Sequence, residues 1–547
     1  MNFSDKQVLI VEDQRPFLLL LRGLLHSMGA SDVVTKSSAE KALSLCKKQK
    51  FDIVVCDLHL GVDKKNGFEL IEELRIKRLI KPTTVFILIS ADSARPVVLG
   101  SIERRPDDYL IKPFSQVQLK TRITRAWQKR QFLGAVLQEV ANENINNAID
   151  LCEDLISTPS PYKGTCEQLL VELYLRLEQY DKALDVLSPY LEGKPIIWAK
   201  VALAKTYLAS EKYDKAIGIA EDIIKRNRFN AEAHDVLAKA NDAKNQGENA
   251  ITAIKQAIKL SPFSLPRHFS ACSIARNHND YILASTSSLA IWDLSKRTVH
   301  QNSLHWCGFI RSLLDVAEYT DDKRTRNRYQ QEALLALQRG KFDENILRID
   351  EDFDVSIFGS IINARVNAID GKMLDAKKNL AQSQAAIDEK YTTPPIAFIP
   401  DSLKVMYDLG EYEDALQLQD IIKQQNLEFD SNSNFLLHSE TTKAQQNLTN
   451  YQQFNREGIQ LYQQGQYEKA KDSFALAQGF SPVNTGVALN LLQCLLQILS
   501  KNQKPDPDLF KQCRRLYKLI DDMPLKAQHE EKYSTLRNDL DTFMGTT

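Results

Sequence analysis

Short apolar runs alternate with helical spacing over the first 128 residues or so. Buried parallel strands are near-continuous apolar runs, and amphipathic helices repeat their apolar positions every three to four residues. The alternation predicts an α/β doubly wound parallel sheet with short connections. The runs that we expect to be strands are 7–11, 32–35, 51–57, 83–90 and 108–111.

Local signals bound the helices between these runs. Pro16 opens a helix that Gly29 stops, and Ser38 caps a second helix that extends to about Lys48. A third follows the Asn66-Gly67 turn, a fourth spans about 94–104, and the last begins near Ser115.

Polar side chains follow these apolar runs at the strand ends, where α/β sheets bind ligands. Glu12 and Asp13 come after the first run, Asp57 ends the third, Ser90 ends the fourth and Lys112 follows the fifth. Three carboxylates on one edge favour Mg²⁺, and a carboxylate can act as a nucleophile toward phosphorus. A metal ion and a lysine would stabilise the charge of a transferring phosphoryl group.

The order of these motifs resembles the receiver domain of response regulators, the CheY-like module of two-component signalling, over residues 5–128. It implies a flavodoxin-like strand order of 2-1-3-4-5. The motifs that carry the likeness are Val-Leu-Ile-Val-Glu12-Asp13, Asp57, Ile-Leu-Ile-Ser90-Ala91 and Asp107-Asp-Tyr109-Leu-Ile-Lys112-Pro113-Phe114.

The resemblance also implies a role for each residue. Asp57 is the phosphoacceptor, Asp13 a direct Mg²⁺ ligand, Glu12 an acidic partner through water, and the His59 carbonyl a further metal ligand. Ser90 and Tyr109 form the switch pair, and Lys112 is the phosphate-binding base.

Three features depart from the family pattern. The loop from Asp57 to Asn66 is longer than usual and lacks a proline. His59 and Asp92 border the acceptor and influence hydrolysis, so the lifetime of a phosphorylated state is open. Arg104-Arg105-Pro106 replaces the usual small residues before the fifth strand, and Pro106 stiffens this corner. The way in which a change at Ser90 is passed on to Tyr109 is therefore open to differ from the family pattern.

The chain beyond residue 128 carries a second pattern. The motif Tyr-Asp-Lys-Ala recurs at 180–183 and 213–216, and related motifs lie at 412–415 and 467–470. The spacing is that of the tetratricopeptide repeat, ~34 residues per helix–turn–helix unit. We therefore expect an all-α helical solenoid over 129–547, after a receiver domain over 1–128.

The units differ in how well they fit the repeat. Clear ones span 164–196, 197–230, 231–264 and 451–484, and degenerate ones lie near 129–163, 265–298, 357–390 and 396–429. Residues 300–350 are expected to be helical without a repeat register, and 485–547 to form three capping helices. Loops are expected at 392–395 and 430–434, with a break in the array near 430–450. The helix from Ser115 either runs on into the first repeat or bends near Gly134.

The first helix of each repeat lines a concave groove. A mixed basic and aromatic groove suits an extended peptide or an acidic helix. The inward positions expected from the repeat geometry are Trp198, Val201, Lys205, Asp235, Lys239, Phe269 and Arg276.

Composition narrows the alternatives. The chain of 547 residues has 70 basic and 71 acidic side chains, which does not favour nucleic acid or membrane as a partner. The eight scattered cysteines are expected to be free thiols, and no signal peptide or membrane span is apparent, so a cytoplasmic location is expected. His268, Cys272 and His278 are interpreted as core or surface side chains, and 323–328 as a solvated helix face.

These patterns predict a two-component response regulator rather than an enzyme. A histidine kinase would phosphorylate Asp57 in the presence of Mg²⁺. The repeats would bind a protein or peptide, and one candidate for this partner is another response regulator or kinase that belongs to a second phosphorelay. The layout is similar to that of VieB-like proteins. The alternative is a constitutive scaffold whose receiver only docks or dimerises; the sequence leaves homodimer formation open.

Overall fold

The computed structural model describes residues 2–61, 64–190, 196–349, 353–501 and 507–545. The chain divides into two compact units, Met1–Gln301 and Asn302–Thr547. The first unit holds the parallel sheet together with the first helix pairs. The predicted change from α/β to all-α structure near residues 128 and 129 therefore lies inside one compact unit. That it is also a boundary between two domains stays a prediction.

Five parallel strands form one sheet in the order β2-β1-β3-β4-β5, which confirms the predicted topology. The apolar runs bury almost completely because the sheet is covered on both faces, and every residue of β3 and β4 is buried. The strands are β1 Gln7–Val11, β2 Asp32–Lys36, β3 Ile53–Asp57, β4 Val85–Ser90 and β5 Asp108–Ile111.

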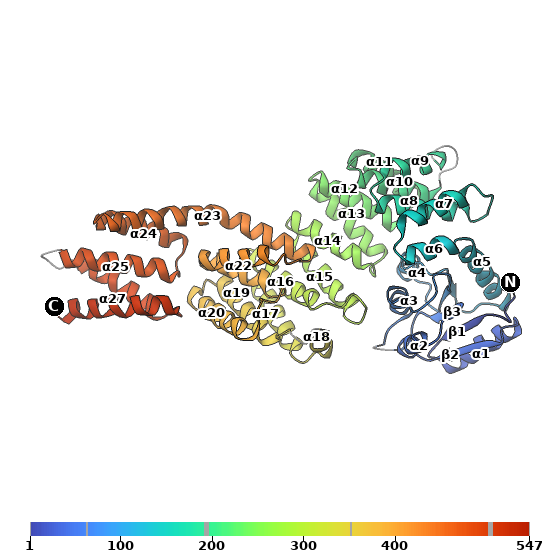
Figure 1. The fold of residues 1–547 in the computed structure, drawn as a ribbon, viewed down its shortest axis with the longest axis horizontal. Helices are drawn as coiled ribbons and strands as arrows, with labels where there is room; N and C mark the ends of the chain where they lie inside the picture. The colour runs from blue at the N-terminus through green and yellow to red at the C-terminus, as the bar shows by residue number, and fades with distance from the viewer. Residues whose placement is uncertain (1, 62–63, 191–195, 350–352, 502–506, 546–547) are drawn as a thin grey trace. The chain divides into compact units, whose positions relative to one another are not determined.

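Helices cover the two faces of this sheet (Figure 1). Leu21 and Leu25 share a core with Leu119 and Ile123 on one face, and α2 and α3 cover the other. The five helices are α1 Arg15–Ser27, α2 Ala39–Cys46, α3 Gly67–Ile76, α4 Arg95–Glu103 and α5 Gln116–Phe132.

The end of α5 decides between the two alternatives for the link to the repeats. Ser115 caps α5 by accepting a hydrogen bond from the backbone amide of Gln118, and the helix ends at Phe132. Leu133 leaves the helical conformation, with φ −90° and ψ 4°, and α6 begins at Gly134. The structure therefore has two helices with a bend at this glycine.

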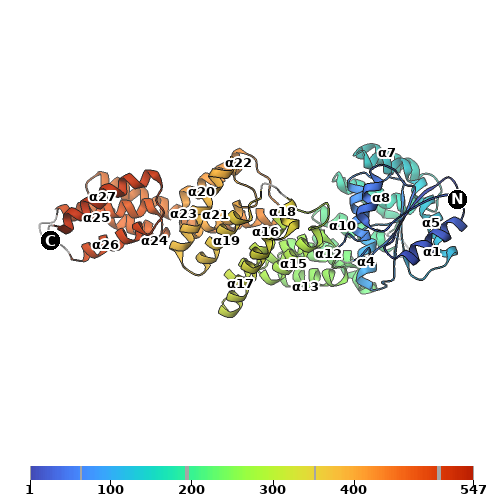
Figure 2. The same cartoon turned by 90° about the horizontal axis from the view of Figure 1, so that it is seen from below.

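The first unit continues as antiparallel helix pairs that pack side by side along the chain (Figures 1 and 2). Each pair buries one central alanine completely, which confirms the repeat register read from the sequence; these are Ala148, Ala183, Ala216, Ala250 and Ala284. The helices are α6 Gly134–Ala141, α7 Ile145–Ile156, α8 Lys163–Arg176, α9 Tyr180–Leu187, α10 Ile197–Ala209, α11 Tyr213–Arg226, α12 Ala231–Ala243, α13 Gly247–Leu260, α14 Leu265–Asn277 and α15 Tyr281–Ser295, with a 3₁₀ turn at Ser188–Tyr190.

Each turn within a pair uses one left-handed residue, five positions before the buried alanine. In the first unit these residues are Glu143, Glu178, Glu211, Asn245 and Asn279, with φ between 57° and 65°. Glycine takes the same place at three turns of the second unit, Gly371, Gly410 and Gly465. A left-handed residue ends one helix and lets the chain reverse. The turn register was not apparent from the sequence because Glu is an unusual choice there.

The second unit is all helical. Its clear repeat and its degenerate pairs again bury central alanines, Ala376, Ala415 and Ala470, and three helices follow residue 484 as predicted. The helices are α16 Ser303–Glu318, α17 Lys323–Gly340, α18 Glu344–Ile349, α19 Val355–Ile369, α20 Met373–Lys390, α21 Ile399–Leu409, α22 Tyr412–Gln424, α23 Ser431–Gln463, α24 Tyr467–Phe480, α25 Thr485–Lys501, α26 Pro507–Asp521 and α27 Ala527–Gly545.

The predicted loop at 430–434 and the predicted break near 430–450 are wrong. A single helix of 33 residues, α23, covers the whole stretch (Figure 1). Asp430 is its N-cap and accepts hydrogen bonds from the backbone amides of Asn432 and Ser433 at 2.9 and 3.1 Å. The polar cluster that resembled a loop is the start of a helix.

A buried ionic network lies inside the second unit and joins residues 311 and 315, where no repeat register was expected, to the degenerate repeats that follow. Arg365 is completely buried and contacts Asp401 at 2.9 Å and Asp315 at 2.5 Å. Arg311 contacts the other oxygen of the same Asp401 at 2.8 Å, and Lys404 contacts Glu440 at 2.9 Å. Charged residues in this region therefore pack α16, α19, α21 and α23 together rather than facing solvent.

Two expectations about the whole chain can be compared with the described residues. All eight cysteines are free and buried, as predicted. Within the described ranges, no helix combines the length and the apolar character needed to cross a membrane.

Candidate functional site

The residues predicted to carry the chemistry meet at the carboxyl edge of the sheet. Asp57 is the last residue of β3 and Ser90 the last of β4, and the strand register pairs Asp57 with Ile89 and Ser90 with Ile111. Lys112 follows β5 directly, and its backbone amide donates to the carbonyl oxygen of Ser90 at 2.8 Å. The parallel pairing thus brings residues from three strands, β3, β4 and β5, to one edge of the sheet, as the sequence predicted.

Lys112 is the positive centre of this cluster. Its ammonium donates to Oδ2 of Asp57 at 2.7 Å and to Oε2 of Glu12 at 2.9 Å. The side chain is 14% exposed, and the Asp57 and Glu12 side chains are 6% and 0% exposed. One lysine therefore bridges two buried carboxylates, which strengthens both contacts because little water screens them.

Sequence analysis missed a residue that supports Lys112. The Lys112 Nζ lies 4.0 Å from the centroid of the Phe17 ring, close enough for a cation–π interaction. Phe17 in turn packs edge-on against Phe114, with ring centroids 6.0 Å apart. The signal in the sequence was the Lys-Pro-Phe motif after β5, but the aromatic partner in α1 could not be read from spacing.

A second missed residue is Gly67, which the sequence marked only as part of a turn. A Cβ atom there would lie 2.7 Å from the carbonyl oxygen of Asp57 and 2.8 Å from the Leu88 side chain. Only glycine fits so close to the backbone of the acceptor residue. The neighbouring Asn66 caps α3 by a reciprocal arrangement with Glu69, which fixes this turn.

Glu12, Asp13 and Asp57 form an acidic cluster. One carboxylate oxygen of each lies within 4.8 Å of the others, and Asp13 is exposed while the other two are buried. The pKa of Glu12 is raised to about 7, chiefly because burial disfavours the charged carboxylate; Lys112 lowers this pKa by its hydrogen bond and charge, and the charge of Asp57 raises it. A divalent cation with a preference for oxygen ligands would relieve this repulsion, so the residues present fit Mg²⁺.

Ser90 and Tyr109, the predicted switch pair, lie near Asp57, the predicted phosphoacceptor. The Ser90 hydroxyl is fully buried and accepts a hydrogen bond from the backbone amide of Asp92 at 3.0 Å. The Tyr109 hydroxyl donates to the carbonyl oxygen of Asp92 at 2.7 Å. Asp92 thus connects the predicted pair, and its segment leads directly into α4.

His59 lies two residues beyond the acceptor. Its backbone amide is 3.3 Å from Oδ1 of Asp57, to which it donates. The role of its carbonyl as a metal ligand stays a prediction. Part of the loop that follows, residues 62–63, lies outside the described residues.

The residues predicted for the groove fall into two groups. Lys205, Asp235 and Lys239 line one cavity of the first unit, and Val201 is buried. Trp198 packs instead against Tyr190, with ring centroids 4.9 Å apart, and Phe269 packs beside the core of Leu265, Cys272 and Ile291. Arg276 is 4% exposed. The role of all these residues in partner binding stays a prediction.

The histidines on the repeats do not meet around a metal. His268 points to the carbonyl oxygen of Pro262 at 2.8 Å, and His278 contacts Asp242 at 2.9 Å. Among the described residues, the group that could hold a metal ion is the acidic cluster at the sheet edge. His268 is buried, which agrees with its interpretation from the sequence as a core or surface side chain.

Comparison with known proteins places this geometry in a class. A model of the response regulator receiver domain matches residues 8–124, and a tetratricopeptide repeat model matches residues 201–264. The alkaline phosphatase synthesis transcriptional regulatory protein PhoP of Bacillus subtilis is 31% identical over 169 residues, which cover 31% of this chain and 67% of PhoP. The chain is therefore a member of the response-regulator family, and it carries tetratricopeptide repeats after its receiver.

Two further similar proteins are a curated regulator and a solved receiver domain. The alginate biosynthesis transcriptional regulatory protein AlgB of Pseudomonas aeruginosa is 33% identical over 142 residues, which cover 26% of this chain and only 30% of AlgB. The receiver domain of the sensor histidine kinase PA1611 from the same species, solved with a magnesium ion in its active-site cleft, is 22% identical. It covers 22% of this chain and 98% of its own, with a TM-score of 0.21.

Proposed function

We propose that Asp57 accepts a phosphoryl group from a histidine kinase, and that its phosphorylation controls protein binding by the repeat array. The observation that carries the proposal is the bridge from Lys112 to Asp57 and Glu12, at 2.7 and 2.9 Å, within a buried acidic cluster. Such a site holds a nucleophilic carboxylate and a fixed positive charge together.

The transfer needs little covalent chemistry from the protein. A carboxylate oxygen of Asp57 attacks phosphorus, the P–N bond to the donor imidazole breaks, and the electron pair stays on the imidazole nitrogen. The Lys112 ammonium, which donates to Asp57 at 2.7 Å, would contact the equatorial oxygens of the incoming group. Glu12, Asp13 and Asp57 would hold Mg²⁺, which supplies further positive charge to those oxygens when bound.

The Ser90 hydroxyl is the residue proposed to sense the product. It is buried next to the acceptor edge and contacts the amide of Asp92. If the Ser90 side chain rotated to donate its hydroxyl proton to a phosphoryl oxygen, the hydroxyl oxygen would move relative to the amide of Asp92. Because Tyr109 donates to the carbonyl of Asp92, a change there would shift the populations of the Asp92 segment and of α4.

Two features support a protein-binding role for the repeats. Tetratricopeptide-type helix pairs stack into extended concave surfaces, and the cavity lined by Lys205, Asp235 and Lys239 lies on this face. We propose regulation of another phosphorelay as one use of this surface, by binding a kinase or a second regulator. The likeness to VieB-like proteins stays a prediction.

The test uses acetyl phosphate as a small phosphodonor. We expect intact-mass spectrometry to show a gain of one phosphoryl group on the full chain, only when MgCl₂ is present. Asp57→Asn should abolish the gain, whereas Asp32→Asn at the amino end of β2, on the opposite edge of the sheet, should not affect it.

The same measurement separates this function from a constitutive scaffold. A wild-type chain that gains no phosphoryl group with Mg²⁺ would favour the scaffold, and so would equal labelling of the Asp57→Asn chain. A histidine kinase domain that carries phosphohistidine then replaces acetyl phosphate to test the donor itself.

A further inference from the structure

The Arg104-Arg105-Pro106 corner, which set this sequence apart from the family pattern, has a defined conformation. Arg105 adopts a left-handed backbone with φ 53°. Arg75 of α3 donates to the carbonyl oxygens of Arg104 and Arg105 at 3.1 and 2.9 Å. The receiver core thus holds the corner in one conformation and leaves the Arg105 side chain directed outward.

The Arg105 guanidinium contacts the first repeats. Its two terminal nitrogens donate to the two carboxylate oxygens of Glu172 in α8 at 2.7 and 2.8 Å. The Glu172 carboxylate, and the charge of Glu232 beyond it, raise the pKa of Arg105. A bidentate pair of this kind fixes the orientation of both side chains, although the Arg105 side chain is 61% exposed and gains little stability from the contact.

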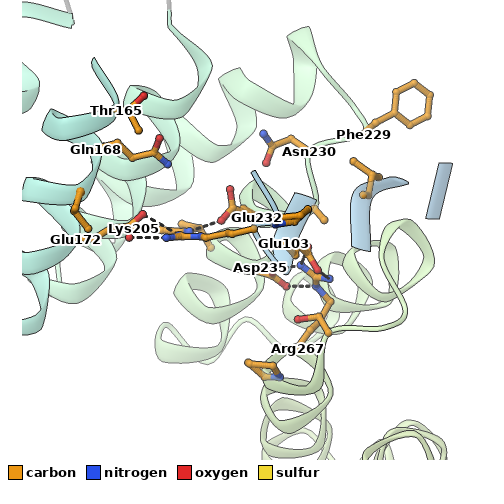
Figure 3. Close-up of a pocket in the computed structure, with 18 of the residues that line it drawn as sticks. Glu103, Thr165, Gln168, Glu172, Lys205, Phe229, Asn230, Glu232, Asp235 and Arg267 are labelled. Atoms are coloured by element: carbon orange, nitrogen blue, oxygen red, sulfur yellow. Dashed lines mark hydrogen bonds and ion pairs between the residues drawn. The ribbon is translucent and has the colours of Figure 1, made fainter. Parts of the chain in front are cut away.

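A second contact lies two residues earlier, at Glu103 (Figure 3). Glu103 and Asp235 both point toward Arg267 of α14, whose Nη2 lies 2.7 Å from Glu103 and 2.6 Å from Asp235. The Arg267 side chain is only 2% exposed. The Ser261 hydroxyl also donates to Glu103 at 2.7 Å. Glu103 is therefore bound by one buried arginine and one hydroxyl of the repeats.

These contacts lie in a groove on the repeats. A cavity of about 800 Å³ opens between the corner and the first helices of successive pairs, α8, α10, α12 and α14. Glu172, Lys205, Asp235 and Arg267 come one from each of these helices. The corner thus occupies the concave side of the array and fills only part of the groove.

Without the side chains of the corner, two charged groups of the groove would each lose a partner. Arg267 would keep Asp235 and lose its second carboxylate, and Glu172 would lose the arginine that it contacts. Lys205 already contacts Glu232 within the repeats. The surface therefore complements a ligand that brings one carboxylate and one guanidinium at the separation of Glu103 and Arg105.

We propose that this groove, here called the corner groove, binds a protein segment with an acid-x-Arg sequence, and that Glu103 and Arg105 occupy it as an internal ligand. The inference rests on the proposed function in that the repeats bind protein. An external partner must displace the corner. Its apparent dissociation constant therefore equals the intrinsic one divided by the fraction of chains in which the groove is open.

The internal ligand is also connected to the phosphoacceptor. The helix α4 begins three residues after Asp92, which accepts the hydrogen bond of Tyr109, and it ends at Glu103. Arg95 in its first turn lies over the Phe229 ring of the repeats, 3.6 Å from the centroid. A movement of α4 on phosphorylation would therefore change how often the groove is open.

The experiment measures binding of a fluorescein-labelled peptide with the sequence of residues 99–108, by fluorescence anisotropy, to the full chain without any phosphodonor. We expect Glu103→Ala/Arg105→Ala to lower the dissociation constant of the peptide about tenfold or more relative to wild type, because the groove is vacated. Adding Glu172→Gln should raise it again about fivefold or more. Adding Glu221→Gln on the outer helix α11 is the matched control and should leave it unchanged.

The proposal is overturned if wild type and the double variant bind the peptide equally, or if neither binds it at about 1 mM peptide. It is also overturned if Glu172→Gln in the double variant changes nothing, or if a peptide with glutamate in place of Arg105 binds as well. An unchanged melting temperature in differential scanning calorimetry checks that each variant is folded. The binding assay contains no phosphodonor. A negative binding result would therefore refute the corner groove without bearing on phosphorylation of Asp57, and a chain that is not phosphorylated could still confirm the groove.

Discussion

Two glycines at the same place in their repeats allow one substitution to be compared in two environments. Gly371 has φ 75° and lies five residues before the buried Ala376, and Gly410 has φ 74° and lies five residues before Ala415. A Cβ on Gly371 would meet nothing within 4 Å. A Cβ on Gly410 would lie 2.5 Å from Cα of Ser481 and 2.9 Å from the carbonyl oxygen of Phe480.

The expected costs follow from this difference. Alanine in the left-handed region costs about 1–2 kcal/mol at either position. At Gly410 the added methyl also meets backbone atoms, which cannot move away by a rotamer change, and overpacking of this kind costs about 1–3 kcal/mol more. We therefore expect Gly410→Ala to reduce the free energy of unfolding of the second unit by about 2–5 kcal/mol, and Gly371→Ala by about 1–2 kcal/mol.

Differential scanning calorimetry of the full chain is the assay. A domain of this size loses about 2–4 °C of melting temperature per kcal/mol, so the transition of the second unit should fall by several degrees more for Gly410→Ala than for Gly371→Ala. Gly465→Ala, with φ 77° and open space around it, is the second control. Equal shifts for all three variants would refute the packing of Gly410 against Ser481 and leave only the backbone strain.

Three further outcomes are expected. Lys112→Met should slow the labelling of Asp57 by acetyl phosphate about tenfold or more, measured by mass spectrometry over time, because it removes the ammonium 2.7 Å from the acceptor; an unchanged rate would contradict its assigned role. Arg365→Met should reduce the free energy of unfolding of the second unit by about 3–5 kcal/mol, since it leaves Asp401 and its neighbours buried with fewer partners. The same change at the exposed Arg348 should cost less than about 1 kcal/mol by urea titration, and equal costs would contradict the buried network. Burial lowers the pKa of His268. The stability that the neutral side chain contributes is therefore fully present above its unfolded pKa of about 6.5 and is lost as the pH falls below that value. His268→Gln should make the melting temperature less sensitive to pH between pH 7 and pH 5, and an identical pH dependence would speak against a neutral buried His268.

The sheet and its site were predictable because their signals are local. Buried parallel strands are apolar along their whole length, so their ends could be placed to within about two residues. Asp57, Ser90 and Lys112 follow from those ends, because parallel strands place their carboxyl termini on one edge. The central alanines were predictable for a similar reason, since helices that approach closely require a small residue at a fixed interval.

The helix α23 was missed because one residue type serves two purposes. The side chain of Asp430 can accept from nearby amides in a loop or at a helix N-cap, and in this chain it does the latter. Ser and Asn after it are weak helix formers, so local propensity favoured the loop. Packing of Leu448 and Tyr451 in the core outweighs that propensity.

The contacts of the corner groove could not be read from the sequence because they join distant segments. Arg105 and Glu172 are 67 residues apart, and Glu103 and Arg267 are 164 residues apart. Charged residues are usually exposed, and Arg365 and Arg311 would have been assigned to solvated faces on that basis. Only the three-dimensional arrangement shows that these charges are paired, and that Arg267, Arg311 and Arg365 are buried.

The length of α23 affects how the second unit unfolds. A helix of 33 residues is about 50 Å long, and it contributes to two separate cores. Leu448 and Tyr451 belong to one of these cores, while Leu461 and Tyr462 pack against the other. If either core melted alone, part of α23 would lose its packing while the rest stayed anchored, and an isolated helical segment is only marginally stable in water. The two cores are therefore linked in their unfolding, so that heat or force should release them in one cooperative step rather than repeat by repeat.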